Sequence, residues 1–426
     1  MEKTNEALED LIKKVDEKTK KIANPQIGYF SLDIVMQKDG APTIVDYNRN
    51  PWGLAIYSKL PDQNRKGNFG CFAHRLGRNI RYFIDRERAV YEHATVAVVV
   101  DPLMFVGLKV ATHYRNSLRI LNGALTGTGI KSRNVFVAPG RKPGDTETTF
   151  ESLHWLQLRE NARPTKRNPI EDATLIINYG GTEYDGNPTY FPKRGVKSIN
   201  APRIASNVVC AKSACHTAIE ELSEEIGLER KTYTPEFVVA PAGVDDVKEA
   251  INGYTKQKRI AMVKYNQYGT GGSAIAVPNP DDLEKRIMET QKMVLKEGKL
   301  HTQMIAVGTK EKFILPFQTV LVEAGVEKKT VELQGSQYMF DVIPFVTITE
   351  AGVFEPMLTT YRIAPKSFKG NLYADGWNAN ETGMIFGVVN QGNIQLSERE
   401  MQEMRLAAKI AGLGLLRLAR SVGDGI

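Results

Sequence analysis

Three oxygen-bearing side chains stand close together near the start of the sequence. Asp46 and Asn48 are two residues apart in an extended stretch, so they project from the same face of a strand. Asp33 lies in the preceding alternating stretch, and the Asp-Gly turn at 38–40 would place it opposite that pair. Oxygen ligands without a nearby histidine or cysteine suit a hard cation such as Mg²⁺, which usually bridges nucleotide phosphates. The alternative interpretation is a polar hairpin whose acids face water.

A second group of residues surrounds a glycine-rich loop that joins two apolar stretches. Gly269, Gly271 and Gly272 would let backbone N–H groups approach an anion without obstruction by side chains. The loop lacks the Gly-Lys-Ser/Thr ending of a Walker loop, and no helix follows it directly. We expect a flap between antiparallel strands that closes over a triphosphate, with Lys264 reaching phosphate oxygens as a point charge. A mobile hairpin without a ligand is the alternative.

Two further charged residues mark strands in the second half of the chain. Glu323 ends the apolar stretch 319–323, where its carboxylate and the neighbouring backbone could accept hydrogen bonds from a ribose and an adenine edge. An acid that simply faces water at a strand end fits equally well. Arg362 is the obvious cation of the last predicted sheet.

The composition is that of a globular protein with more than one packed unit. The 426 residues exceed one ordinary hydrophobic core, and 42% are hydrophobic while 25% are charged. Three cysteines are too few for a disulfide framework, which favours a reducing compartment. We therefore expect a cytoplasmic location, without a membrane span or a secretory signal. The net charge of +7 is compatible with nucleotides, but its spread along the chain argues against nucleic acid as a partner.

The order of apolar stretches predicts an α/β (α+β) chain. Continuous β-branched runs indicate buried strands of a mostly parallel sheet, and they lie at 94–102, 134–140, 172–181 and 195–202. Periodic stretches indicate helices at 105–125, 148–160, 205–226, 245–254, 281–297 and 397–420. The patterns also indicate strands at 237–241, around 304–307, at 319–323 and at 384–389, and successive antiparallel strands from 331 to 360.

Taken together, these residues resemble the ATP-grasp ligases. That family has two lysines that contact the nucleotide, a glycine-rich flap, a strand-end acid and a metal-binding hairpin of the form Asp, then acid-x-Asn. The resemblance implies a role for each matched position. It implies nucleotide contacts by Lys212, Lys264, Gly269, Gly271, Gly272, Glu323 and Asn48, metal contacts by Asp33, Asp46 and Asn48, and catalytic roles for Arg362 and Lys264.

The order of these motifs implies a circular permutation. The metal hairpin normally ends the chain, whereas here it comes near the start, as it does in eukaryotic-type glutathione synthetases. The stretches 348–363 and 381–393 are similar to the C-terminal sheet and loop of those enzymes. The implied fold is a circularly permuted ATP-grasp fold with a parallel-sheet substrate domain. Its expected parts are the permuted C-terminal piece 1–90, the substrate domain 91–204, the flap-bearing subdomain 205–330 and the remaining subdomain 331–426.

The resemblance implies an ATP- and Mg²⁺-dependent ligase that joins a small acid to an amine through an acyl phosphate, with a homodimer left open. The sequence departs from the family where a second metal-binding acid would stand, because Tyr268 occupies that place. Either Asp341 or no protein group replaces that acid. The family's substrate residues are not matched, so the acid and the amine stay open. A kinase on the same fold, or a non-catalytic nucleotide- or nucleic-acid-binding protein, are the alternatives.

Overall fold

The computed structural model describes the following parts of the chain, and every structural statement below concerns them. They are residues 2–22, 27–48, 75–80, 95–100, 105–106, 109–110, 120–127, 129–130, 135–139, 155–157, 164–165, 175–179, 198–199, 212–228, 233–266, 274–290, 293–305, 312–316, 319–368 and 385–423. Among the helices of these parts, none is both long and apolar enough to cross a membrane.

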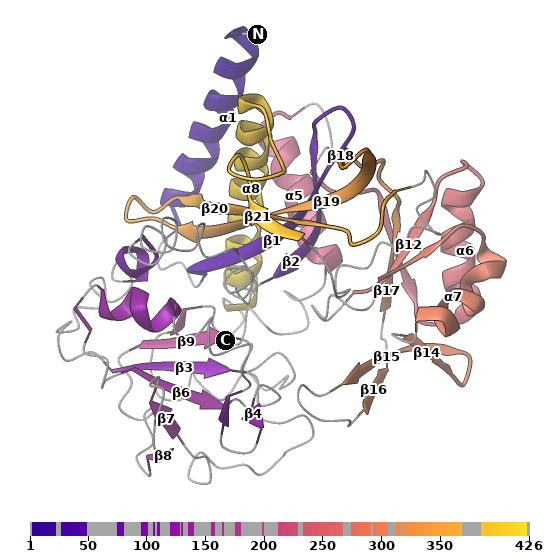
Figure 1. Cartoon of the computed structure of the whole chain (residues 1–426), viewed down its shortest axis with the longest axis horizontal. Coiled ribbons are helices and arrows are strands. Elements are labelled where there is room, and N and C mark those ends of the chain that lie inside the picture. The colour runs from indigo at the N-terminus through magenta and orange to yellow at the C-terminus, as the bar shows by residue number, and fades with distance from the viewer. Residues whose placement is uncertain are drawn as a thin grey trace.

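The central sheet joins strands from the two ends of the chain. Its order is β2-β1-β19-β20-β21, and β18 pairs with β19. All of its pairings are antiparallel, and Figure 1 shows the N-terminal strands lying beside the strands of the last hundred residues. The strands are β1 (Tyr29–Met36), β2 (Pro42–Asn48), β18 (Thr330–Leu333), β19 (Ser336–Ile348), β20 (Phe354–Ile363) and β21 (Ile385–Val388).

The predicted hairpin of β1 and β2 is confirmed, and its turn explains the register. The Gln37 N–H donates to the Ala41 carbonyl at 2.8 Å, and Gly40 adopts a φ of 88°, which glycine reaches without strain. With this turn, Asp33 lies directly across from Asp46. The pairing shifts by one residue just after Asp33, so the two acids sit at a local irregularity of the ladder.

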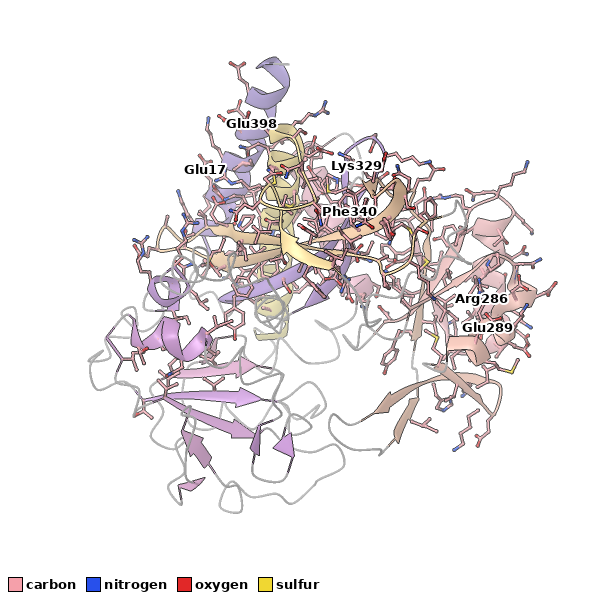
Figure 2. The ribbon with its side chains drawn as sticks, in the orientation of Figure 1. Glu17, Arg286, Glu289, Lys329, Phe340 and Glu398 are labelled. Carbon is pink, nitrogen blue, oxygen red and sulfur yellow. The ribbon has the colours of Figure 1, made fainter. Side chains whose placement is uncertain are left out.

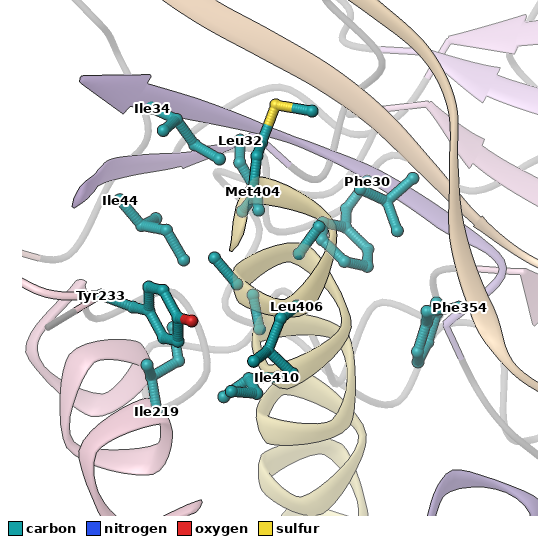
Figure 3. Packing of buried hydrophobic residues seen from close by; sticks show 14 of the residues in the cluster. Phe30, Leu32, Ile34, Ile44, Ile219, Tyr233, Phe354, Met404, Leu406 and Ile410 are labelled. Atoms are coloured by element: carbon teal, nitrogen blue, oxygen red, sulfur yellow. The ribbon is translucent and has the colours of Figure 1, made fainter. Parts of the chain in front are cut away.

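Three helices cover one face of the central sheet. They are α1 (Glu2–Lys20), α5 (Lys212–Glu225) and α8 (Glu398–Gly423). The alternation in β1 sends Phe30, Leu32 and Ile34 into this layer, where all three are fully buried. Figure 3 shows them beside Leu406 and Ile410 of α8. The opposite face of β1 therefore carries the polar residues Ser31 and Asp33.

A smaller antiparallel sheet lies beside the central one. Its order is β11-β17-β12-β13, with β11 at Phe237–Pro241, β17 at Thr319–Ala324, β12 at Ala261–Tyr265 and β13 at Ala274–Val277. The helices α6 (Val244–Thr255) and α7 (Leu283–Thr290) pack on one of its faces. Arg286 and Glu289 form an ion pair on α7, at the outer side of this unit (Figure 2).

The structure corrects the helix predicted at 281–297. A short 3-10 helix (Pro280–Asp282) leads into α7, and the chain then turns into a three-stranded sheet of order β14-β15-β16. Its strands are β14 (Met293–Lys296), β15 (Lys299–Ile305) and β16 (Lys312–Pro316). Glu297 and Gly298 both have positive φ, 54° and 71°, and they form the two-residue connection of the β14–β15 hairpin. Glu-Gly is thus the signal that ends the helical pattern.

A separate sheet has the order β10-β9-β3-β6-β7-β8. Its first four strands pair in parallel, and β7 and β8 run antiparallel. The strands are β3 (Val96–Val100), β6 (Val135–Pro139), β7 (Trp155–Gln157), β8 (Pro164–Thr165), β9 (Leu175–Tyr179) and β10 (Ser198–Ile199). The four β-branched stretches of the sequence supply β3, β6, β9 and β10, because strands buried on both faces consist of such residues.

Two predicted helices of this region are wrong in whole or in part. The stretch 105–125 begins with the short strands β4 (Phe105–Val106) and β5 (Lys109–Val110), and its described residues from 120 onward are helical. In these strands Phe105 is the register partner of Val110, and Val106 is that of Lys109. The stretch 148–160 contains β7, whose Gln157 lies opposite Phe136 of β6. In both places, pairing with a neighbouring strand outweighs local helical periodicity.

Candidate active site

Lys264 and Glu323 lie on the same face of the smaller sheet. Glu323 of β17 is the register partner of Met262, and Lys264 follows two residues later on β12, so the two side chains are diagonal neighbours. The Nζ atom of Lys264 lies 2.5 Å from Oε2 of Glu323, and their side chains are 9% and 2% exposed. The opposite face of this sheet packs on α6 and α7. The two charges therefore point away from the apolar core of the unit.

The carboxylate of Glu323 is ionised despite its burial. Burial alone would raise its pKa, but the charge of Lys264 and a hydrogen bond from His216 outweigh that effect and lower the pKa of Glu323 to about 2. The Nε2 atom of His216 lies 3.0 Å from Oε1 of Glu323. Each carboxylate oxygen thus has a partner of its own in the ligand-free chain.

The hairpin β1–β2 meets this sheet at its polar face. The ammonium of Lys264 donates a hydrogen bond of 2.8 Å to the carbonyl of Val45. Lys212, the first residue of α5, forms an ion pair with Asp46, the next residue of β2. The structure therefore brings both sequence-predicted lysines to the hairpin that carries the predicted metal ligands, although the hairpin lies more than 160 residues earlier in the chain.

The start of α5 is fixed to the end of β12. The backbone N–H of Lys212 donates to the carbonyl of Asn266 at 2.8 Å, and the N–H of Ser213 donates to its side-chain Oδ1 at 2.9 Å. Two orphan donors of the helix start are thereby satisfied. Asn266 in turn donates to Thr319 Oγ1 of β17 at 3.0 Å. These bonds hold Lys212 in a set position relative to Lys264.

Arg362 links two acids of the central sheet. Its Nη2 atom lies 2.7 Å from Asp33 and 2.9 Å from Asp341, and its Nε atom donates to Asp341 at 3.1 Å. Burial would lower the pKa of Arg362, but the two carboxylates outweigh it and raise that pKa. Burial raises the pKa of Asp33, and Arg362 opposes this effect. The guanidinium thus keeps two buried acids of β1 and β19 together.

Lys328 is a further cation beside this group. Its Nζ atom lies 3.8 Å from Oδ1 of Asp341, at the entrance to β18. Burial, together with the charges of Arg362 and Lys264, lowers the pKa of Lys328 to about 8, and Asp341 opposes the shift. Oδ1 of Asp341 is buried and has no hydrogen-bond partner among the described residues.

The oxygen donors present here fit Mg²⁺ in kind. Asp33 and Asp46 face each other across the hairpin, and Oδ1 of Asp341, which accepts no hydrogen bond among the described residues, is an oxygen that a cation would satisfy. Within the described ranges, however, no three His, Cys, Asp or Glu side chains already converge as a ligand set. Asp33 is paired with Arg362 and Asp46 with Lys212, so a cation would have to exchange places with these partners.

The predicted site residues fall into two groups, which are connected by one pair of facing residues. Lys212, Lys264, Glu323 and Asp46 form one group, and Asp33 with Arg362 forms the other; the pair of Asp33 and Asp46 joins them. The flap glycines Gly269, Gly271 and Gly272 lie outside the described residues, and so does the side chain of Asn48, whose backbone pairs with Ser31.

Sequence reasoning missed His216 and Lys328. His216 follows Lys212 by four positions and therefore shares its face of α5. That spacing is a signal that could have identified it. Lys328 stands in a Lys-Lys pair at a strand start, and nothing in that pattern distinguishes a buried lysine from a solvated one.

Comparisons with known proteins place the fold. No protein-family model matches the sequence, and no curated protein matches it. A crystal structure from Methylobacillus flagellatus KT, provisionally named as a gamma-glutamylcysteine synthetase, has a TM-score of 0.58 at 12% identity over 98% of this chain and 94% of its own. D-alanyl-alanine synthetase A from Vibrio cholerae O1 biovar eltor has a TM-score of 0.35 at 13% identity over 74% and 78% of the two chains.

The first of these structures covers nearly the whole of both chains. The likeness therefore concerns the complete arrangement of sheets and helices. At 12% identity the likeness is one of fold. Activity has to be argued from the side chains of the site.

Proposed function

We propose that this protein is an ATP- and Mg²⁺-dependent carboxylate–amine ligase, which forms an amide bond through an acyl phosphate. The observation that carries the proposal is the meeting of Lys264 with the metal hairpin, through the hydrogen bond to Val45 beside Asp46. A nucleotide site needs cationic side chains that bind the phosphates, next to oxygen ligands that bind a metal ion. Here those two kinds of group, from opposite parts of the sequence, share one small region.

Each residue of the region has a role in this proposal. Lys212 and Lys264 contact phosphate oxygens, Glu323 accepts hydrogen bonds from the nucleoside, and the glycines of the flap cover the triphosphate. Asp46 and Asn48 hold Mg²⁺, with Asp33 in support, and Asp341 is the candidate for a second ion. The metal supplies charge neutralisation at the phosphates. Arg362 stabilises the negative charge that develops on the transferred phosphoryl group.

The proposed reaction has two steps. A carboxylate oxygen of the acid attacks the γ-phosphorus, and the bond to the β–γ bridging oxygen breaks, so that ADP leaves and an acyl phosphate forms. The amine nitrogen then attacks the acyl carbon, phosphate leaves, and the nitrogen loses a proton to solvent. The protein contributes position and charge, and a closed flap excludes the water that would hydrolyse the acyl phosphate.

The ion pairs of Lys212 and Lys264 support the proposal in a second way. Lys212 and Lys264 are held by Asp46 and Glu323, so the cations are already charge-balanced and almost buried. Burying unpaired charges would be costly. A triphosphate bound with Mg²⁺ would exchange with these partners, because Asp46 would hold the ion and phosphate oxygens would pair with the ammonium groups.

The circular permutation and the domain division belong to the same proposal. β1 pairs with β19, so the N-terminal hairpin forms one edge of a sheet otherwise built from the C-terminal part. A permuted chain would need this arrangement, with 1–90 completing the subdomain 331–426. The parallel sheet within 91–204 is the proposed substrate domain, and 205–330 carries the flap.

The test is phosphate release from ATP with amino acids and short peptides supplied singly and in pairs. Glutamate with cysteine is one pair of the panel, because the similar structure of M. flagellatus is provisionally named for their product. The ligase proposal predicts release only when an acid and an amine are both present. ADP formation with one substrate alone, without release of phosphate, would indicate a kinase. ATP binding without any release, or nucleic-acid binding that falls steeply with salt, would contradict the proposal.

A further inference from the structure

A buried histidine connects the two halves of the candidate site. His216 of α5 is fully buried, and both of its ring nitrogens have partners. Nδ1 lies 2.8 Å from the hydroxyl of Tyr47 on β2, and Nε2 lies 3.0 Å from Glu323 on β17. The ring also contacts Phe237 of β11, with centroids 5.3 Å apart. The proposed mechanism does not use this side chain.

The partners on the two sides define which nitrogen carries the proton. Glu323 is ionised, so its Oε1 accepts a hydrogen bond from Nε2–H of His216. The hydroxyl of Tyr47 lies within hydrogen-bond distance of Nδ1, and it can donate to that nitrogen when Nδ1 carries no proton. An imidazole with its proton on Nε2 satisfies every group in this series of hydrogen bonds.

The same series of hydrogen bonds reaches the hairpin β1–β2 at one end and Lys264 at the other. The backbone N–H of Tyr47 donates to Oδ1 of Asp46 at 2.8 Å, so the residue that holds His216 also holds the proposed metal ligand. At the other end, the second oxygen of Glu323 holds Lys264 at 2.5 Å. Hydrogen bonds therefore run from Asp46 through Tyr47, His216 and Glu323 to Lys264.

The geometry points to His216 as a positioning residue that fixes Glu323 for the nucleotide and couples its orientation to the metal hairpin through Tyr47. This inference rests on the proposed function, because it assigns Glu323 to the nucleotide. His216 itself would touch neither the nucleotide nor the metal. It acts by limiting a buried carboxylate to one orientation, which lowers the cost of ordering that group when the ligand binds.

The test is a double-mutant cycle on the equilibrium dissociation constant of ATP, measured with EDTA and again with Mg²⁺. Tyr47→Phe removes one hydroxyl and keeps the ring, and we expect it to weaken ATP binding roughly three- to ten-fold. In a Glu323→Gln background the same substitution should change binding less than about two-fold, because the group that it orients is no longer the native one. Equal effects in both backgrounds, or no effect in the wild type, would overturn the inference.

Two further variants separate positioning from general loss of packing. Tyr233→Phe removes another buried hydroxyl, which donates to Glu403 at 3.0 Å, and it should leave the dissociation constant of ATP unchanged. His216→Leu should weaken ATP binding, and His216→Gln should restore part of the loss because its amide can still donate to Glu323. A His216→Gln variant no better than His216→Leu would count against the inference. Thermal unfolding of each variant shows whether it is folded.

A measurement without ATP keeps this test distinct from that of the proposed function. In protein labelled with ¹⁵N at its six histidines, the resonances lost in His216→Gln identify this ring. We expect a proton on Nε2 and an Nδ1 shift that changes in Tyr47→Phe. A proton on Nδ1 in place of Nε2 would overturn the inference even if ATP binds. If ATP does not bind but the proton is on Nε2 of His216, the proposed function fails, and only the hydrogen bonds of His216 to Tyr47 and Glu323 are supported.

Discussion

The ammonium of Lys264 donates a 2.8 Å hydrogen bond to the backbone carbonyl of Val45, a residue 219 positions earlier in the chain. The acceptor is a main-chain atom, so the contact depends on the position of the strand β2 and not on the side chain of Val45. It fixes where the next residue, Asp46, lies relative to the smaller sheet. The juxtaposition of lysine and carboxylate is therefore built into the way the two sheets meet.

Asp46→Asn tests the metal assignment with little change of shape. The amide oxygen can still accept from the N–H of Tyr47, but the charge that Mg²⁺ requires is gone. We expect Mg²⁺-dependent ATP turnover to fall by more than about ten-fold, measured as phosphate release over a range of Mg²⁺ concentrations. Asp10→Asn on α1, where the side chain is 69% exposed, is the control. Turnover of Asp46→Asn at the wild-type level would remove Asp46 from the metal site.

Glu323 should make the fold sensitive to acid in a defined window. Its pKa of about 2 in the folded chain lies below the ordinary 4.5, so its ionised form stabilises the fold fully above pH 4.5. That stabilisation, about 3 kcal/mol, is lost as the pH falls from 4.5 towards 2. In Glu323→Gln the free energy of unfolding should therefore depend less on pH across this window, as denaturant titrations at each pH would measure.

Glu225 provides a matched control for that experiment. The pKa of its carboxyl is also lowered to about 2, mainly by hydrogen bonds from Arg417 and Lys18, but its side chain is 39% exposed. Solvent screens such a pair, so we expect Glu225→Gln to change the acid dependence by less than about 1 kcal/mol. An equal effect of the two substitutions would contradict the account of Glu323.

Arg362 should be essential for stability because it separates two buried acids. Arg362→Met would leave Asp33 and Asp341 facing each other without their shared cation, and we expect a loss of about 3–5 kcal/mol in the free energy of unfolding. Asp341→Asn in the same chain should recover part of that loss, because it removes one of the two like charges. Arg286→Met is the control on α7, where the partner Glu289 is 43% exposed and the loss should stay near or below about 1 kcal/mol. No difference between the two arginines would refute the interpretation.

Local patterns predicted the elements that hold the site. Alternation in β1 and the Asp-Gly turn are properties of neighbouring residues, so the hairpin and the facing of Asp33 and Asp46 could be read directly. The signal that ends α5 is also formed by neighbouring residues. Gly227 adopts a φ of 85°, and the N–H of Leu228 donates to the carbonyl of Ser223 at 2.9 Å, which is a Schellman end.

Contacts between distant segments could not be predicted in the same way. The pairing of Asp46 with Lys212 depends on how α5 docks on the hairpin, and no periodicity encodes that. The network of His216 was missed for the same reason, because its partners come from β2 and β17. The helix predictions at 105–125 and 148–160 failed where β4 pairs with β5 and where β7 pairs with the more distant β6.

The central claim is that one Mg²⁺–ATP complex is held between Lys264 of the smaller sheet and Asp46 of the hairpin. Calorimetric titration of Mg²⁺–ATP into the wild type, Lys264→Met and Asp46→Asn tests this claim most directly. We predict that the wild type binds, that each variant binds at least about ten-fold more weakly, and that Lys248→Met on α6 binds as the wild type does. Wild-type affinity in both Lys264→Met and Asp46→Asn would contradict the claim.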